Sequence, residues 1–329
     1  MDFHGLDLNQ LVVLDVLLEE RNITRTGKRI HLCQSATSCI LGKLREFFSD
    51  ELLVQVGRQM VLTPLAEDLI LPVREVLQQA QLLIDRSQVF TPSNSRRRYR
   101  VILSDYIETI LAASVLRRVE REAPSVSVEL LPFGESVAET LERGEIDFLI
   151  APDSEISPSH PSVSLFKDTY VCVLWSGNRL VGDSISFEQY LNLGHVGINF
   201  GKGRYHSWDE ALMAQKGYKR RVEVIVSSFG VMANYVVGTS RIATMHRRLA
   251  DHYQKLLPLR IVELPFAMPP LVEKLQWHQY LDKTPNHRWL RTIFLEEAAR
   301  MNAGSVLRVG NRTDREHDSS AELELTTVQ

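Results

Sequence analysis

Cysteine is scarce in this chain of 329 residues. The three cysteines, Cys33, Cys39 and Cys172, form no CxxC pair and no even set that could build a disulfide framework. This usage is typical of proteins from reducing compartments. We therefore expect a cytoplasmic protein, and a redox sensor built on Cys33 and Cys39 stays open as an alternative.

Long apolar runs are also absent. No run approaches the roughly 18 residues that a membrane span needs, and the first seven residues, MDFHGLD, lack the basic-then-apolar order of a signal peptide. The composition, 44% hydrophobic and 24% charged, is ordinary for a globular protein. We expect a soluble protein of two or three domains with no membrane partner.

Catalytic and metal-binding motifs are missing too. The sequence contains no GxSxG, Walker A or HExxH motif. The glycines of GINFGKG at 197–203 have the wrong spacing for a dinucleotide fingerprint, and the ten histidines form no recognisable metal set. The sequence therefore predicts neither an enzyme nor a bound cofactor or metal.

The stretch Arg21–Phe48 has the pattern of two short amphipathic helices. Ile23 and Ile30 lie seven residues apart, and a second helical pattern follows the break at 31–33. Two such helices joined by a short turn are the frame of a helix-turn-helix. Seven Lys/Arg against three Asp/Glu in 21–58 favour a DNA partner, in a chain of net charge −3. A helical hairpin in an ordinary core is the alternative.

The second helix would then enter the major groove of double-stranded DNA. Its outward positions hold Gln34, Ser35, Ser38 and Cys39, while Ala36 and Ile40 are expected to face inward. Gln can form a bidentate pair with adenine, and Ser can pair with several bases. The predicted DNA-binding residues are Thr24, Gln34, Ser35, Ser38, Cys39, Lys43 and Arg58.

A wing and a long helix are expected next. Two short β runs surround Gly57-Arg58-Gln59, which indicates a hairpin. Thr63 is then a plausible N-cap and Pro64 the first residue of a helix. Apolar residues at three- and four-residue spacings run through 65–86, interrupted by Pro72, which should bend the helix. This stripe needs a partner, either a second copy or the rest of its own domain.

This order of elements resembles the LysR-type transcriptional regulators from Leu8 to about Met301. The matching residues are LNQL at 8–11, QSATS at 34–38, Gly57-Arg58 and LTP at 62–64. The resemblance implies a DNA-binding head, dimerisation through the long helix, a tetramer as the working state, and contact with RNA polymerase. Four residues depart from the family pattern, and they are Cys33, Ser35, Gly27 and Thr37. Gly27 alone costs a helix about 1 kcal/mol relative to Ala.

From Tyr99 the pattern changes to alternating strands and helices, which implies parallel sheets. Two α/β units joined by crossing strands resemble periplasmic binding proteins. We therefore predict an all-α winged helix-turn-helix (1–63), a linker helix (64–86), a hinge (87–98), and a two-lobed α/β effector domain (99–302). Lobe I comprises 99–167 and 268–302, and lobe II comprises 168–267. A disordered tail (303–329) follows, because it holds too few apolar residues to fold.

The hinge contains the basic run Arg96-Arg97-Arg98-Tyr99-Arg100. Such a run usually lies in solvent, and it could alternatively touch flanking phosphates.

An effector cleft is expected where strands end beside helix N-termini. Hydroxyls and aromatic rings gather there, which suits a small aromatic ligand, although each residue could equally be an ordinary cap or core residue. The predicted effector-binding residues are Ser104, Tyr106, Phe200, Ser228 and Phe229.

A narrower resemblance is to the NodD and SyrM group of nodulation regulators. It rests on GLDLN at 5–9, ERNIT at 20–24, FFSDEL at 47–52, TSRIATMHRRLA at 239–250 and LRIVELP at 259–265. The group implies activation of symbiosis promoters, with a flavonoid inducer or with none. A LysR-type regulator of aromatic-compound catabolism is the alternative. A solute-binding protein would need a signal peptide, and a fused α/β enzyme would need a catalytic set.

Overall fold

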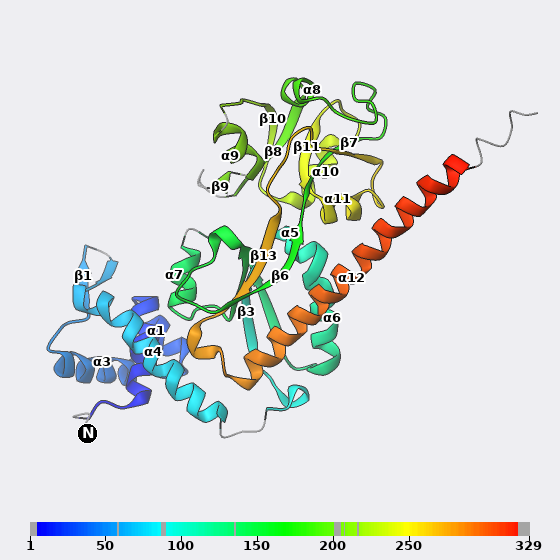
Figure 1. The fold of residues 1–329 in the computed structure, drawn as a ribbon. Coiled ribbons are helices and arrows are strands. Elements are labelled where there is room, and N and C mark those ends of the chain that lie inside the picture. The colour runs from blue at the N-terminus through cyan, green and yellow to red at the C-terminus, as the bar shows by residue number, and fades with distance from the viewer. Residues whose placement is uncertain are drawn as a thin grey trace, which may run out of the picture. The chain divides into compact units, whose positions relative to one another are not determined.

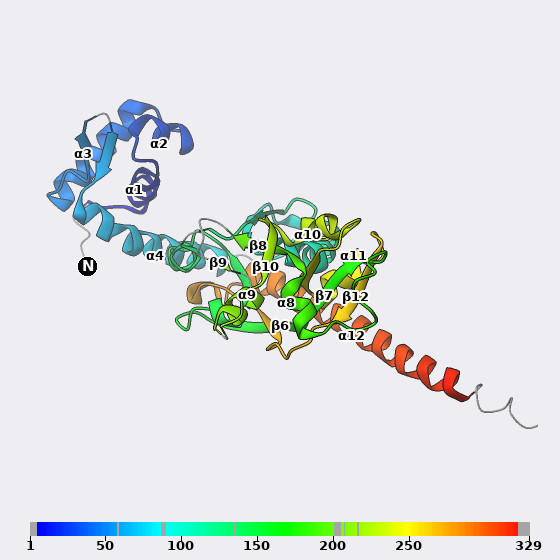
Figure 2. The ribbon, with the colours of Figure 1, turned by 90° about the horizontal axis from the view of Figure 1, so that it is seen from above.

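The computed structural model describes residues 5–57, 59–86, 90–134, 136–200, 205–206, 208–215 and 217–321. The chain divides into two compact units. The first contains residues 1–90 together with 138–145 and 278–285, and the second contains the remaining residues from Thr91 onward. Each unit is described by itself (Figures 1 and 2).

Three helices form the N-terminal head, α1 (Leu8–Glu20), α2 (Ile23–Arg29) and α3 (Gln34–Phe48). Helices α1 and α2 each begin just after a residue whose side chain accepts a hydrogen bond from a backbone N–H of the helix. Asp7 and Gln10 form a reciprocal capping box on α1, and Asn22 caps α2. The expected break at 31–33 is confirmed, with His31 at a positive φ of 58°.

The head has a core of its own. Leu14, Leu17, Leu41 and Leu44 are fully buried between α1 and α3. On α3 the inward position is Thr37, which is 0% exposed, whereas Ala36 and Ile40 are only half-buried. The expectation that Ala36 and Ile40 carry the buried face was therefore only partly right.

The wing and the linker helix follow as predicted. Strands β1 (Leu53–Val56) and β2 (Gln59–Leu62) pair antiparallel, and helix α4 (Pro64–Arg86) begins directly after them. Thr63 caps α4, because its Oγ1 accepts the Ala66 N–H at 3.2 Å and donates to Asp50 at 2.6 Å. Helix α4 runs through Pro72 without interruption in its helical assignment.

Lobe I is built on a five-stranded sheet with the order β4-β3-β5-β13-β6. Strand β3 pairs parallel with β4 and β5, and β13 pairs antiparallel with β5 and β6. The strands are β3 (Arg98–Ile102), β4 (Ser127–Leu131), β5 (Phe148–Pro152), β6 (Ser162–Asp168) and β13 (Leu271–Gln276). A continuous helical segment follows β3, made of α5 (Asp105–Ile107), the π-helical turn η2 (Glu108–Ala112) and α6 (Ala113–Glu122).

Lobe II is built on a second sheet with the order β10-β8-β11-β7-β12, and β9 pairs with β8. Its strands are β7 (Tyr170–Trp175), β8 (Gly194–Phe200), β9 (Tyr205–His206), β10 (Arg221–Val226), β11 (Ile242–His246) and β12 (Leu259–Glu263). Its helices are α8 (Phe187–Asn192), α9 (Trp208–Gln215), α10 (Phe229–Val236) and α11 (Arg247–Tyr253). The chain enters lobe II from β6 and leaves it through β13, as Figure 1 shows.

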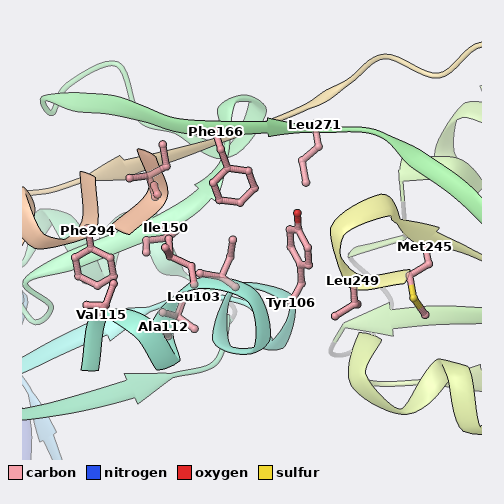
Figure 3. Close-up of a cluster of buried hydrophobic side chains, with 14 of the residues drawn as sticks. Leu103, Tyr106, Ala112, Val115, Ile150, Phe166, Met245, Leu249, Leu271 and Phe294 are labelled. Carbon is pink, nitrogen blue, oxygen red and sulfur yellow. The ribbon is translucent and has the colours of Figure 1, made fainter. Parts of the chain in front are cut away.

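One apolar core extends through both lobes. Leu103 and Ile150 of lobe I and Met245 and Leu249 of lobe II belong to the same buried cluster, with Tyr106 between them (Figure 3). The lobes therefore share buried surface in addition to their two crossing strands.

Three features differ from the sequence predictions. Strand β6 and helix α11 were not anticipated, and the closing helix α12 (Pro285–Ala321) continues past Met301 into the predicted disordered tail. Helix propagation from an already docked segment needs no new nucleation, which accounts for the extension. Residues 322–329 lie outside the described part of the chain. Among the described residues, no helix is long and apolar enough to span a membrane.

Candidate nucleic-acid interface and effector site

The exposed face of α3 is the candidate DNA-reading surface. Gln34, Ser35, Ser38, Cys39 and Lys43 are all exposed, at positions related by three to five residues along the helix. Side chains four residues apart lie on one helix face, so Ser35, Cys39 and Lys43 form one row and Gln34 and Ser38 form a second row beside it. Both rows belong to the exposed surface of α3, from which the buried Thr37 and Leu41 point away.

The other two predicted DNA contacts lie outside α3. Thr24 is exposed in the first turn of α2. Arg58 lies outside the described residues.

Ion pairs within the head remove part of the basic excess. Arg25 and Arg29 both pair with Glu20, and Arg45 pairs with Glu51. Lys28 and Lys43 are exposed and form no ion pair among the residues that the structure describes. These lysines are therefore better candidates for phosphate contacts than the three arginines.

Arg45 has a role that the sequence analysis missed. Its Nε donates to the Glu51 carbonyl at 2.8 Å, and one of its terminal nitrogens donates to the Leu53 carbonyl at 3.0 Å. These bonds fix the end of α3 to the start of the wing. A basic residue in the last turn of a helix, four residues before its C-cap, was the available signal.

Gly27 and Thr37, two of the residues that depart from the family pattern, lie against each other in the structure. The Thr37 hydroxyl donates to the Cys33 carbonyl at 3.1 Å, which satisfies it inside the core. A Cβ added at Gly27 would lie 2.8 Å from the Leu32 carbonyl oxygen and 2.9 Å from Thr37 Oγ1. The turn between α2 and α3 therefore packs too closely for any side chain at Gly27.

The N-terminus of α3 is weakly capped. Cys33 is the N-cap residue, and it makes no side-chain cap bond in the described structure. Its Sγ instead lies 3.2 Å from Ser35 Oγ. The hydrogen bond with Ser35 lowers the pKa of the Cys33 thiol.

The basic run before lobe I is largely paired. Arg97 donates to Asp147 at 2.9 Å, and Arg98 and Arg100 pair with Glu129. Asp147 is buried and also contacts His287 Nε2 at 2.8 Å. Arg97 thus anchors the chain just before β3, while Arg98 and Arg100 stay exposed, as expected of a basic run in solvent.

The predicted effector residues come together only in part. Ser104 caps α5 by accepting the Ile107 N–H, and Ser228 caps α10. The rings of Tyr106 and Phe229 lie 6.4 Å apart, with His246 stacked on Tyr106 at 4.2 Å. Phe200 ends β8, where its backbone pairs with Tyr205.

A buried acidic group adjoins these residues. Tyr106 donates to Asp168 at 2.5 Å, and the Arg248 backbone N–H donates to the same carboxylate at 3.2 Å. Glu273 is 3% exposed, and burial together with the nearby Asp168 raises its pKa to about 8. Sequence reasoning missed both carboxylates, because strand spacing alone does not show which side chains face each other across a crossing pair.

A winged helix-turn-helix joined by a long helix to a two-lobed α/β domain defines a class of DNA-binding regulator with a separate effector domain. Residues 8–67 match the family model described as bacterial regulatory helix-turn-helix protein, lysR family, and residues 92–299 match the LysR substrate binding domain. The chain therefore belongs to the LysR family of transcriptional regulators. This confirms the predicted family and fold, and the family consists of regulators and not of enzymes.

Its similarity to known proteins extends over most of its length. The chain is 45% identical over 303 residues to Nodulation protein D 1 of Mesorhizobium japonicum, covering 92% of this chain and 96% of that protein. It is 44% identical over 301 residues to Nodulation protein D of a Bradyrhizobium strain, covering 92% and 89%. The predicted likeness to nodulation regulators is thus confirmed.

Solved structures agree on the fold. A transcriptional regulator from Pseudomonas aeruginosa shares 26% identity with a TM-score of 0.62, covering 88% of this chain and 96% of that one. Full-length OxyR from the same organism superimposes with a TM-score of 0.69 at 17% identity, covering 90% and 95%. At 17% identity, the similarity to OxyR supports the fold alone.

Proposed function

We propose that this protein is an activator of nodulation genes that recognises its operators through the exposed face of α3. The observation that carries the proposal is the long match to two proteins named for nodulation, together with an intact DNA-binding head. The relatives share 45% and 44% identity across 92% of this chain. The protein would act in the cytoplasm, at promoters served by RNA polymerase.

Base reading is assigned to the first turns of α3. Gln34 is exposed there and can form a bidentate pair with adenine, while Ser35 and Ser38 can accept from or donate to several bases. Thr24, Lys43 and Arg58 would contact the backbone and set the register, and Cys39 would contribute a small contact surface.

Dimerisation is assigned to the outward side of α4. Leu69 and Leu77 pack against the core of the head, so the head accounts for part of the apolar stripe. Val76 and Leu83 remain 45% and 70% exposed. A second α4 would cover them and hold two heads at successive half-sites. Two such dimers would form the working tetramer.

A small aromatic compound, such as a plant flavonoid, is the proposed effector, and action without an inducer is the competing mode. The hydroxyls and rings of Ser104, Tyr106, Ser228 and Phe229 support an aromatic ligand at the junction of the lobes. Phe200 is proposed as a further contact. Regulation would require the ligand to bind one arrangement of the protein more tightly than another.

Footprinting tests this proposal. DNA upstream of the protein's own gene and of its divergent neighbour would be probed with no addition, with a flavonoid panel, and with simple aromatic acids. We expect a protected region at least one helical turn long, and a reporter fused to a nodulation promoter should be activated. Protection without activation of any nodulation promoter would contradict the proposed role.

A further inference from the structure

Asp105 of lobe I is bonded to the N-terminus of a helix in lobe II. Its Oδ2 accepts the Ser228 hydroxyl at 2.6 Å and the Gly230 backbone N–H at 2.7 Å. Ser228 is the N-cap of α10, and Gly230 is the second residue of that helix. Asp105 does not cap its own helix, because Ser104 does. The carboxylate therefore serves the opposite lobe.

The chemistry of this contact is that of an anion at a helix N-terminus. The first N–H groups of a helix have no partner within it, and they carry partial positive charge that favours a carboxylate. The Ser228 hydroxyl also lies 3.2 Å from the Gly230 nitrogen. Both donors thus converge on one oxygen of Asp105.

Gly230 permits this close approach. A Cβ at Gly230 would lie 3.1 Å from the Tyr253 hydroxyl and 3.4 Å from Asp105 Oδ2. A Cβ there would crowd the Tyr253 hydroxyl and would just touch the Asp105 carboxylate. The absence of a side chain at Gly230 therefore leaves room for the carboxylate of Asp105 from lobe I.

Other contacts between the lobes also hold them together. The guanidinium of Arg248, on α11 of lobe II, donates to the side-chain oxygen of Asn302 on α12 at 2.8 Å. The Tyr106 ring of lobe I stacks on His246 of lobe II at 4.2 Å, and the shared apolar core lies beside it (Figure 3). Asp105 is thus one part of a closed junction made entirely by this chain.

We propose that Asp105 is a specificity-determining residue that supplies the chain's own carboxylate to the anion-binding end of α10. The occupied donors hold the two lobes closed without a ligand and reject carboxylate-bearing effectors at this position. The part concerning effectors rests on the proposed function of the domain. The closure itself rests only on the bonds between Asp105, Ser228 and Gly230.

Two like charges compete for the same donors if an anionic effector approaches. The incoming carboxylate would meet the Asp105 carboxylate, and it could bind only after the lobes had separated. An effector that binds the closed arrangement must therefore be uncharged where it faces α10. This narrows the expected ligands to neutral aromatic molecules and disfavours simple aromatic acids.

Chemical rescue tests the proposal in the full-length protein. Asp105→Ala removes the carboxylate and leaves its donors open, and acetate has the size and charge of the deleted group. Thermal unfolding would be followed in sodium acetate and in sodium chloride of equal ionic strength at pH 7.5. We expect a lower Tm for Asp105→Ala, with about 2–4 °C regained specifically and saturably in acetate.

Three controls define the result. Wild type, the exposed-site variant Glu120→Ala, and Asp105→Asn should show no acetate-specific rise, since the first two keep the carboxylate and the third fills its space. Ser228→Ala should lower the Tm of wild type more than it lowers the Tm of Asp105→Ala, because the Ser228 hydroxyl and the Asp105 carboxylate are the two partners of one hydrogen bond. If Asp105→Ala does not fold, this comparison is made between wild type and Asp105→Asn.

An unchanged Tm in Asp105→Ala, or an equal acetate response in wild type, overturns the proposal. The proposal is also overturned if Ser228→Ala lowers the Tm of the Asp105→Asn variant as much as it lowers the Tm of wild type. These measurements need neither DNA nor an inducer. A failure to activate nodulation promoters would therefore leave the rescue result unaffected, and the two proposals can fail separately.

Discussion

Gly27 and Thr37 illustrate how residue-level rules can mislead when each is applied alone. Helix propensity predicts that Gly27→Ala stabilises α2 by about 1 kcal/mol. The structure places the new methyl group 2.8 Å from the Leu32 carbonyl oxygen, which belongs to the backbone and cannot rotate away. Overpacking of this kind costs about 1–3 kcal/mol.

We therefore expect Gly27→Ala to lower the free energy of unfolding of the head. Urea unfolding followed by far-ultraviolet circular dichroism measures this, and Gly42→Ala is the control, because a Cβ at the exposed Gly42 would meet nothing within 4 Å. A Gly27→Ala protein more stable than wild type would show that the turn between α2 and α3 is looser than described.

Cys33 offers the opposite case, in which a rule should hold. A serine hydroxyl at the N-cap accepts a backbone N–H bond that the Cys33 thiol does not make. Cys33→Ser should raise the free energy of unfolding by about 0.5–1 kcal/mol. Cys39→Ser, at an exposed position inside α3, should change it little. Equal effects of the two substitutions in urea unfolding would argue against a capping origin.

Glu273 should make stability depend on pH. Burial and then Asp168 raise its pKa to about 8 in the folded protein, whereas an unfolded glutamate titrates near about 4.3. Between these values the unfolded chain loses the proton and the folded chain keeps it. The contribution of Glu273 to the free energy of unfolding therefore falls as the pH rises from about 4.5 to about 8.

Glu273→Gln should remove this dependence and stabilise the protein at pH 8, by on the order of 1–4 kcal/mol. The measurement is urea unfolding at pH 5, 6.5 and 8, with the exposed-site variant Glu155→Gln as the control. If the slope with pH is as steep in Glu273→Gln as in wild type, the carboxyl of Glu273 ionises normally in the folded state.

At the scale of the elements, the sequence was most informative where one local signal was strong. The Thr63-Pro64 pair, followed by three- and four-residue apolar spacings, placed α4 at Pro64–Arg86 as the structure has it. Strand β6 escaped notice because Ser162–Asp168 follows a run of Ser and Pro and alternates only weakly. Which side of α4 packs on the head could not be predicted, since that depends on tertiary contacts.

Part of the apolar stripe of α4 packs on the head and part is exposed, so dimerisation can be tested at the exposed part alone. Val76→Glu with Leu83→Glu places charges on the exposed side and leaves Leu69 and Leu77 in the core of the head. We expect a smaller oligomer in light scattering and operator affinity at least tenfold weaker, because two half-sites would no longer be held together. The control is Glu67→Gln, at an exposed position nine residues before Val76 and therefore on the opposite side of α4. An unchanged oligomer would place the contact elsewhere.

At the scale of the whole molecule, alternating strands and helices predicted α/β sheets, and the resemblance to periplasmic binding proteins supplied the two-lobed arrangement. The junction of the lobes was not predictable. The bond from Asp105 to Ser228 joins residues 123 positions apart in the sequence. Neither residue carries a local signal of its partner. The candidate DNA-reading face was easier to predict, since five of its residues follow from helical spacing within α3 alone.

The central claim is that α3 reads operator sequence. The most direct measurement is fluorescence anisotropy of wild type, Gln34→Ala and Lys43→Ala on a footprinted operator and on shuffled DNA, across a range of salt concentrations. Gln34→Ala should lose about 1–3 kcal/mol on the operator and little on shuffled DNA. Lys43→Ala should weaken both and reduce the salt dependence. A folded Gln34→Ala protein that keeps wild-type affinity and base preference would contradict the account.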